Sequence, residues 1–138
     1  MDRTEFCSLF AKIKENRAVK WLELIIATHT DRSNLIGVFN GKTNFFVETA
    51  IKIAQSIGAL IVLKKGQEQI ELNSPTTLTW WAKKSQQESG LSVNKFKDEI
   101  GMSRVAVTAN LKGESKMRID TLLKWAEITG YSVEVWTK

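Results

Sequence analysis

The sequence predicts a mainly α-helical fold made of two tandem copies of one small helical unit, each followed by a short β-strand or hairpin. Three observations support this prediction. A displacement of 72 residues aligns two stretches of the chain without a gap. Within each stretch, apolar residues recur every three or four positions, which is typical of amphipathic helices. After the last helical segment of each copy the apolar period changes to two, which indicates a strand.

The repeat is the strongest of these observations because glycines and apolar positions coincide in the two copies. The first stretch runs from Asp31 to Leu63 and the second from Ser103 to Val135. Residues are identical at Arg32/Arg104, Gly41/Gly113, Thr49/Thr121, Lys52/Lys124, Ala54/Ala126 and Gly58/Gly130. The chain is therefore expected to divide into two domains, residues 1–73 and residues 74–138.

Each copy is expected to contain four helices. In the second copy these helices are expected at 76–89, 92–100, 103–111 and 118–129, because polar caps and glycines stand at their ends. The first helix of the first copy is expected at 4–17. Alternation of apolar and polar residues predicts a strand at 131–135 and a β-hairpin at 59–72. These strands are expected to pair with each other or with a second chain.

Composition and charge limit the classes of function. The net charge of +5 and the pI of about 9.4 suit a polyanionic partner. Basic residues outnumber acidic ones by ten to eight in residues 1–73 and by ten to seven in residues 74–138, so neither half is a basic tail. No apolar run reaches membrane-spanning length and no signal-peptide pattern opens the chain, which favours a cytoplasmic protein without a membrane partner.

The sequence offers little support for an enzyme. The single histidine, His29, has no second histidine or cysteine nearby, and the single cysteine, Cys7, lies among apolar residues. Residues 40–43 (Asn-Gly-Lys-Thr) are similar to the end of a phosphate-binding loop, but the upstream glycine and strand of that motif are missing. We expect no catalytic residues, no metal and no cofactor.

A short helix, a glycine turn and a second short helix with a polar cap are typical of the helix-turn-helix. The segment Ile100-Gly101-Met102-Ser103-Arg104 and the ending Asn110-Leu111-Lys112-Gly113 resemble the λ-repressor/Cro-like (Xre-type) superfamily. The helix and strand that follow also resemble HigA-type antitoxins of that superfamily. The resemblance covers residues 91–136 and, less closely, 19–63. It implies two tandem λ-repressor-like domains that bind double-stranded DNA and regulate transcription, as a repressor of a phage, plasmid or other mobile element.

The third helix of each copy, near 103–111 and 31–39, would then lie in the major groove. Its exposed positions are the expected base contacts: Arg104, Val105, Thr108 and Ala109 in the second copy, and Arg32, Ser33 and Asn34 in the first. An arginine in this place matches the O6 and N7 atoms of guanine. Phosphate contacts, which fix the register, are expected from Ser103, Asn110, Lys112 and Lys116, and from Asn40, Lys42 and Asn44.

Two alternatives stay open. The first copy departs from the family pattern, because His29 stands where glycine is expected and Asp31 brings a negative charge near the DNA backbone. That copy is expected either to contact DNA or to serve in dimerisation or partner binding. The alternative function for the whole chain is a protein-binding module, an antitoxin or an inhibitor of a host factor. Its partner surface, or a homodimer contact, would use the strands or an exposed Trp80.

Overall fold

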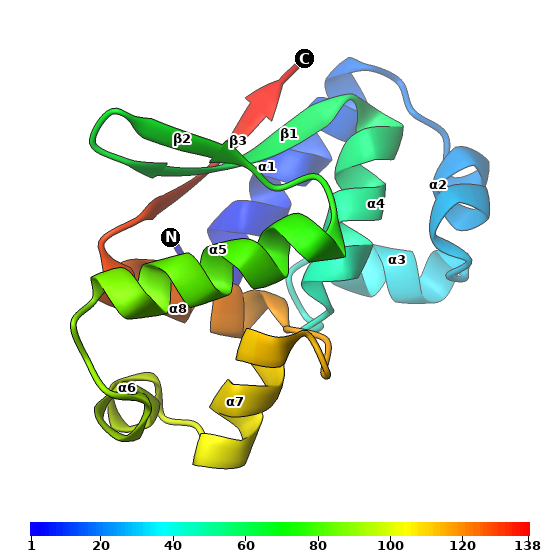
Figure 1. The fold of residues 1–138 in the computed structure, drawn as a ribbon. Helices are drawn as coiled ribbons and strands as arrows, with labels where there is room; N and C mark the ends of the chain where they lie inside the picture. Colours follow the sequence, from blue (N-terminus) through cyan, green and yellow to red (C-terminus); the bar gives the residue numbers. More distant parts are fainter.

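Each half of the chain contains four helices in the computed structural model, which describes residues 1–138. The first half comprises α1 (Arg3–Asn16), α2 (Trp21–Thr28), α3 (Arg32–Phe39), α4 (Val47–Ile57), β1 (Ala59–Lys65) and β2 (Glu68–Glu71). The second half comprises α5 (Pro75–Glu88), α6 (Val93–Ile100), α7 (Arg104–Lys112), α8 (Ile119–Thr129) and β3 (Ser132–Thr137). The structure confirms a mainly helical chain with a small sheet (Figure 1). No helix combines the length and the apolar character needed to cross a membrane.

The repeat in the sequence is also a repeat in the structure. The four helices of the second half begin 72 residues after those of the first, at 75, 93, 104 and 119 against 3, 21, 32 and 47. Left-handed backbone conformations recur with the same displacement, at Ala18/Gly90, His29/Gly101, Gly41/Gly113 and Gly58/Gly130. The helix ends are therefore set by the same backbone geometry in both halves, even where the residue that adopts it differs.

Polar caps fix the starts of the two third helices. The side chain of Asp31 accepts a hydrogen bond from the backbone N–H of Asn34, and the side chain of Ser103 accepts one from Ala106. These bonds satisfy backbone donors that have no partner within the first turn of a helix. The capping residues thus place α3 and α7 directly after the turn that ends the preceding helix.

The turn between α2 and α3 holds a non-glycine residue in the left-handed conformation. His29 adopts a left-handed conformation (φ 55°), and so does the equivalent Gly101 (φ 75°). Only His29 has a Cβ atom, which crowds the backbone in this conformation. We expect His29→Gly to raise the free energy of unfolding by up to about 1 kcal/mol, because relief of strain exceeds the added flexibility of the unfolded chain. Gly101→Ala is the reverse control and should lower it. Equal stability of the His29→Gly variant and the parent in urea unfolding would contradict the expectation.

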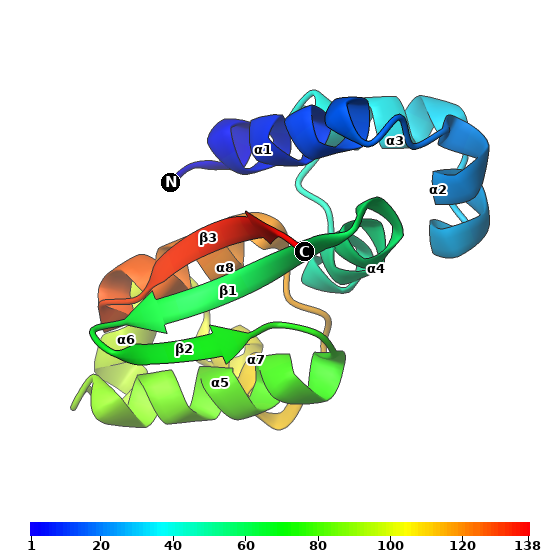
Figure 2. The same ribbon diagram turned by 90° about the horizontal axis from the view of Figure 1, so that it is seen from above.

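A three-stranded antiparallel sheet joins the two halves. The strand order is β2-β1-β3, so β1 pairs both with its hairpin partner and with the strand of the other half. This confirms the hairpin expected at 59–72. Of the two pairings left open by the sequence, β1 and β3 pair within the chain, with Ile61 opposite Val135 and Leu63 opposite Val133. Figure 2 shows α1 along the β3 edge of this sheet and α5 along its β2 edge.

One hydrophobic cluster of 34 buried residues draws on both halves. In the second half, Trp125 is fully buried, its ring lies 4.7 Å from that of Phe96, and its Nε1 donates to Ser85 Oγ at 3.0 Å. In the first half, the rings of Phe6 and Phe10 lie 4.7 Å apart. The expected boundary near residue 74 falls between β2 and α5, and the cluster continues across it.

Cys7 lies inside this cluster with 1% of its surface exposed. Burial raises the pKa of its thiol to about 11, so the reactive thiolate is scarce near neutral pH. We expect iodoacetamide to leave Cys7 unmodified in the folded protein and to alkylate it in denaturant, as measured by mass spectrometry. Rapid alkylation without denaturant would contradict the buried position of this thiol.

A cluster of polar side chains ties α5 to the hairpin and to β3. Lys84 Nζ lies 2.8 Å from carboxylate oxygens of both Glu68 and Glu88, and the Tyr131 hydroxyl lies 3.1 and 2.9 Å from the same two groups. Hydrogen bonds from Lys84 lower the pKa of both carboxyl groups. Burial raises the pKa of Tyr131 to about 12, so its hydroxyl stays protonated as a donor.

This cluster predicts a contribution to acid sensitivity. Because the folded pKa values of the two glutamates lie below 4.5, their contribution to stability is complete above that pH and is lost as pH falls through the lowered values. Lys84→Met should therefore reduce the drop in melting temperature between neutral pH and about pH 3. Lys12, the equivalent lysine of α1, makes no ion pair, so Lys12→Met should leave that drop unchanged. An equal drop in the parent and in Lys84→Met would contradict the contribution.

Candidate nucleic-acid interface

The second half presents two short helices joined by a tight turn. α6 ends at Gly101, which adopts a left-handed conformation, and Ser103 then caps α7. Phe96 and Ile100 of α6 and Val107 of α7 are buried, so the two helices pack through one apolar face each. The opposite face of α7 is left for solvent or for a ligand.

The predicted base-contact residues occupy that outer face. Arg104 is exposed at the first position of α7, and Val105 beside it is 80% exposed, the largest value among the large apolar side chains. Thr108 and Ala109 follow on the same helix and are half-buried. A single exposed apolar side chain is common on protein surfaces, so Val105 supports a contact surface only together with the residues beside it.

Of the four residues predicted to contact phosphate in this half, three are exposed: Ser103, Lys112 and Lys116. Lys116 Nζ lies 3.5 Å from a carboxylate oxygen of Glu48, a solvent-exposed pair of small energetic weight. Asn110 is different, because it is 7% exposed and its side-chain oxygen accepts a hydrogen bond from Ser115. The expectation of a phosphate contact from Asn110 is therefore corrected: its side chain stabilises the end of α7.

In the first half the predicted base contacts are also exposed, but their surroundings differ. Arg32, Ser33 and Asn34 open α3, and all three face solvent. The amide nitrogen of Asn34 donates to Asp31 at 3.2 Å, so part of its hydrogen-bonding capacity is already used. The predicted phosphate contacts Asn40 and Lys42 are exposed as well.

Asn44, the remaining predicted phosphate contact, lies at the junction of the halves. Its side-chain oxygen accepts a hydrogen bond from the backbone N–H of Asp120, and its carbonyl oxygen accepts one from Arg118. It is half-buried. Asn44 thus caps α8 of the other half through its side-chain oxygen, and its contact with phosphate stays a prediction. The sequence pattern within one copy contains no signal for a contact between copies.

Three exposed residues near α7 were missed by reasoning from the sequence. Asn94 and Lys95 stand in the first turn of α6, and Arg118 follows the loop after α7. The cap Ser92 before Asn94 and Lys95 was the available signal, because a helix start offers free N–H groups to an anion. Nothing local marks Arg118, whose guanidinium lies 4.5 Å from the Phe46 ring of the first half.

The charge of the two equivalent surfaces is unequal. Residues 92–95 and 103–118 carry five basic residues and one acidic residue, a net charge of +4. The equivalent residues 20–23 and 31–46 carry three basic and two acidic residues, a net charge of +1. At the start of α2, Leu22 and Glu23 replace Asn94 and Lys95. The second half is therefore the more favourable surface for a polyanion.

Exposed apolar residues lie outside α7 in both halves. Leu22 and Ile26 on α2 are 64% and 65% exposed, whereas the equivalent positions on α6 are Asn94 and Asp98. On α5, Trp80 is 53% exposed, while its neighbour Trp81 is fully buried, as expected for the core. These residues form two separate apolar surfaces outside α7.

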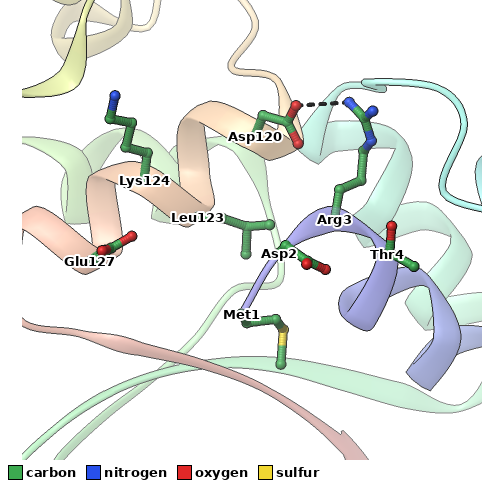
Figure 3. A pocket seen from close by; sticks show the side chains of 8 residues that line it. All are labelled: Met1, Asp2, Arg3, Thr4, Asp120, Leu123, Lys124 and Glu127. Atoms are coloured by element: carbon green, nitrogen blue, oxygen red, sulfur yellow. Dashed lines mark hydrogen bonds and ion pairs between the residues drawn. The ribbon is translucent and has the colours of Figure 1, made fainter.

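A cavity of about 440 Å³ lies between the start of α1 and α8 (Figure 3). Arg3 and Asp120 pair across it at 2.8 Å, and Lys124 and Glu127 line it from α8. Pro75 is the equivalent of Arg3, so the second half has no such ion pair. The residues that line the cavity come from α1 and its start in the first half and from α8 in the second half, so the cavity lies where the two halves meet. No group of three or more histidine, cysteine or acidic side chains is placed to hold a metal ion.

The chain was compared with known proteins on three levels. Comparison with protein-family models, with curated proteins and with solved structures finds no match.

Proposed function

We propose that the chain is a sequence-specific, double-stranded DNA-binding regulator of transcription that acts as a repressor, with α6 and α7 as a helix-turn-helix. The observation that carries this proposal is the outer face of α7. There an exposed arginine and an exposed valine open the helix, and α7 with the start of α6 and the loop after α7 (residues 92–95 and 103–118) carries a net charge of +4. A binding module for a polyanion needs this combination of specific and general contacts.

The proposed mechanism places the start of α7 in the major groove. Arg104 donates two hydrogen bonds to a guanine, and Val105 contacts the methyl group of a thymine. Lys95, Lys112, Lys116 and Arg118 neutralise phosphates, which supplies affinity without sequence preference. Bound at a promoter, the protein would exclude the transcription machinery from the same DNA.

The first half contributes less in this proposal. α3 presents Arg32 and Ser33 to a second stretch of DNA, but its surface carries a net charge of only +1 over the equivalent residues. Because both helix pairs belong to one chain, the second is held near the duplex once the first is bound, and even a weak second contact raises affinity.

Salt-dependent binding tests the proposal. Fluorescence anisotropy with a labelled duplex of the protein's own promoter region should show binding whose log affinity falls with log salt at a slope of about −3 to −4, from about four phosphate contacts. The double variant Lys112→Ala/Lys116→Ala should reduce this slope by about 2, and Lys12→Ala on α1 should leave it unchanged. No salt-sensitive binding to the promoter or to random duplexes would refute the proposal.

A second candidate function is a protein-binding module, an antitoxin or an inhibitor of a host factor. The exposed Leu22 and Ile26 favour it, because they stand on α2 where the equivalent α6 residues are polar. Under this function a stoichiometric protein partner co-purifies with the chain, is lost in Leu22→Asp/Ile26→Asp and is retained in Arg104→Ala. Duplex binding that depends on Arg104 without such a partner would exclude it.

A further inference from the structure

The two halves meet through reciprocal contacts between equivalent residues. The backbone N–H of Val47 donates to the carbonyl of Met117 at 2.8 Å, and the N–H of Ile119 donates to the carbonyl of Phe45 at 2.7 Å. The two bonds are equivalent, because Ile119 is the equivalent of the donor Val47 and Phe45 is the equivalent of the acceptor Met117. These bonds flank a bridge between Phe46 and Arg118, which are themselves equivalent.

The pairing of β1 with β3 shows the same reciprocity. Val62 lies opposite Glu134, its own equivalent under the displacement of 72. On either side, Ile61 pairs with Val135 and Leu63 pairs with Val133, and adding 72 again exchanges these two pairs. When residue i contacts the equivalent of residue j, and residue j contacts the equivalent of residue i, the two copies are related by a two-fold axis and not by a translation.

These two contacts define one axis through the molecule. It passes between Phe46 and Arg118 at one end and between Val62 and Glu134 in the sheet at the other. α3 ends at Phe39, a few residues before Phe46, and α7 ends at Lys112, a few residues before Arg118, so both third helices lead toward the same end of the axis. Figure 2 shows α1 and α3 toward the β3 edge of the sheet and α5 and α7 toward the β2 edge, as expected for a two-fold axis that relates α1 to α5 and α3 to α7.

We infer that one chain binds one duplex site made of two half-sites in inverted orientation and of unequal sequence. This inference rests on the proposed function. The two-fold axis of the protein aligns with a two-fold axis of the DNA, and the half-site centres lie about one helical turn, roughly 10 base pairs, apart.

The half-sites differ because the two third helices differ. Arg104 and Arg32 stand at equivalent positions, so each half-site contains a guanine at the same place. Beyond that position Val105 and Thr108 are replaced by Ser33 and Ile36, which offer different groups to the bases. Ser33 lacks the apolar side chain that favours a thymine methyl, and the base next to that guanine therefore differs between the half-sites.

Selection of bound duplexes from a pool of about 30 random base pairs tests this inference with the full chain. The expected product is a site with two unequal half-sites in inverted orientation, bound by one chain per duplex in analytical ultracentrifugation. Arg104→Ala should remove the base preference in one half-site only, and Arg32→Ala should remove it in the other. A second selection with each variant measures this directly.

The possible failures are distinguishable. Two half-sites in direct orientation, a single half-site per chain, or two chains on a symmetric site would overturn the inference while leaving DNA binding intact. Absence of any enriched, salt-sensitive duplex would instead refute the proposed function. A fixed-probe control uses the selected site with one half-site reversed, and binding to it should fall to the level of a single half-site.

Discussion

Replacement of Arg104 by alanine is expected to weaken binding to the selected duplex by about 5- to 150-fold, since a bidentate arginine–guanine contact contributes about 1–3 kcal/mol. The side chain is exposed at the start of α7 and makes no hydrogen bond or ion pair within the protein. Its loss should therefore leave the free energy of unfolding within about 0.5 kcal/mol of the parent. Anisotropy and urea unfolding measure the two quantities separately.

The specificity of this loss is the sharper part of the prediction. Arg104→Ala should discriminate less against a duplex in which the contacted guanine is changed, whereas the sequence-independent affinity at low salt falls little. Lys12→Ala is the control, because it removes one positive charge from α1, away from α7. Lys12 is the equivalent of Lys84, and Lys84 pairs with Glu68 of the hairpin. Lys12→Ala should not alter discrimination. An Arg104→Ala protein that discriminates between the two duplexes as well as the parent would contradict the role of this residue.

Replacement of Trp125 by alanine is expected to lower the free energy of unfolding by about 3–5 kcal/mol. Its ring is fully buried against Phe96, and its Nε1–H is the hydrogen-bond donor to buried Ser85. Removal leaves both a cavity and an unpaired polar group. Trp80→Ala is the matched control, because Trp80 is 53% exposed and its loss should change stability by about 0.5 kcal/mol or less.

The same variant tests whether the halves unfold together. Cys7 belongs to the first half and Trp125 to the second, yet both are part of the one buried cluster. Alkylation of Cys7 in Trp125→Ala should therefore begin at the lower denaturant concentration at which the second half unfolds. Continued protection of Cys7 at denaturant concentrations where the backbone amides of α8 already exchange freely would contradict a shared core.

Local signals in the sequence predicted most of the elements. The helix expected at 76–89 is found at Pro75–Glu88, and the hairpin is in place, because caps, glycines and apolar periods act over a few residues. Ala18 was the exception: it adopts φ 53° where the second half has Gly90, and alanine does not signal a left-handed turn. Backbone hydrogen bonds from Ala18 to Glu15 and from Val19 to Lys14 close the end of α1 in that conformation.

Position near a third helix did not determine the roles of Asn44 and Asn110, and the sequence left two strand pairings open. Asn44 and Asn110 were both expected at phosphates because they are polar residues near the third helices, yet one caps α8 and the other is buried beneath the loop after α7. The pairing of β1 with β3, and the bridge between Phe46 and Arg118, join residues that belong to different halves of the chain. Periodicity within one segment carries no information on such partners.

The most direct test of DNA binding through α7 is a map of the contact surface in solution. Titration of isotope-labelled protein with a duplex of its own promoter, followed by amide chemical shifts, should show the largest changes at residues 92–95, 103–109 and 112–118. Smaller changes should occur at 31–37, and the hairpin 59–72 should be unaffected. Changes confined to α2 and the hairpin, or no change at any duplex concentration, would contradict DNA binding through α7.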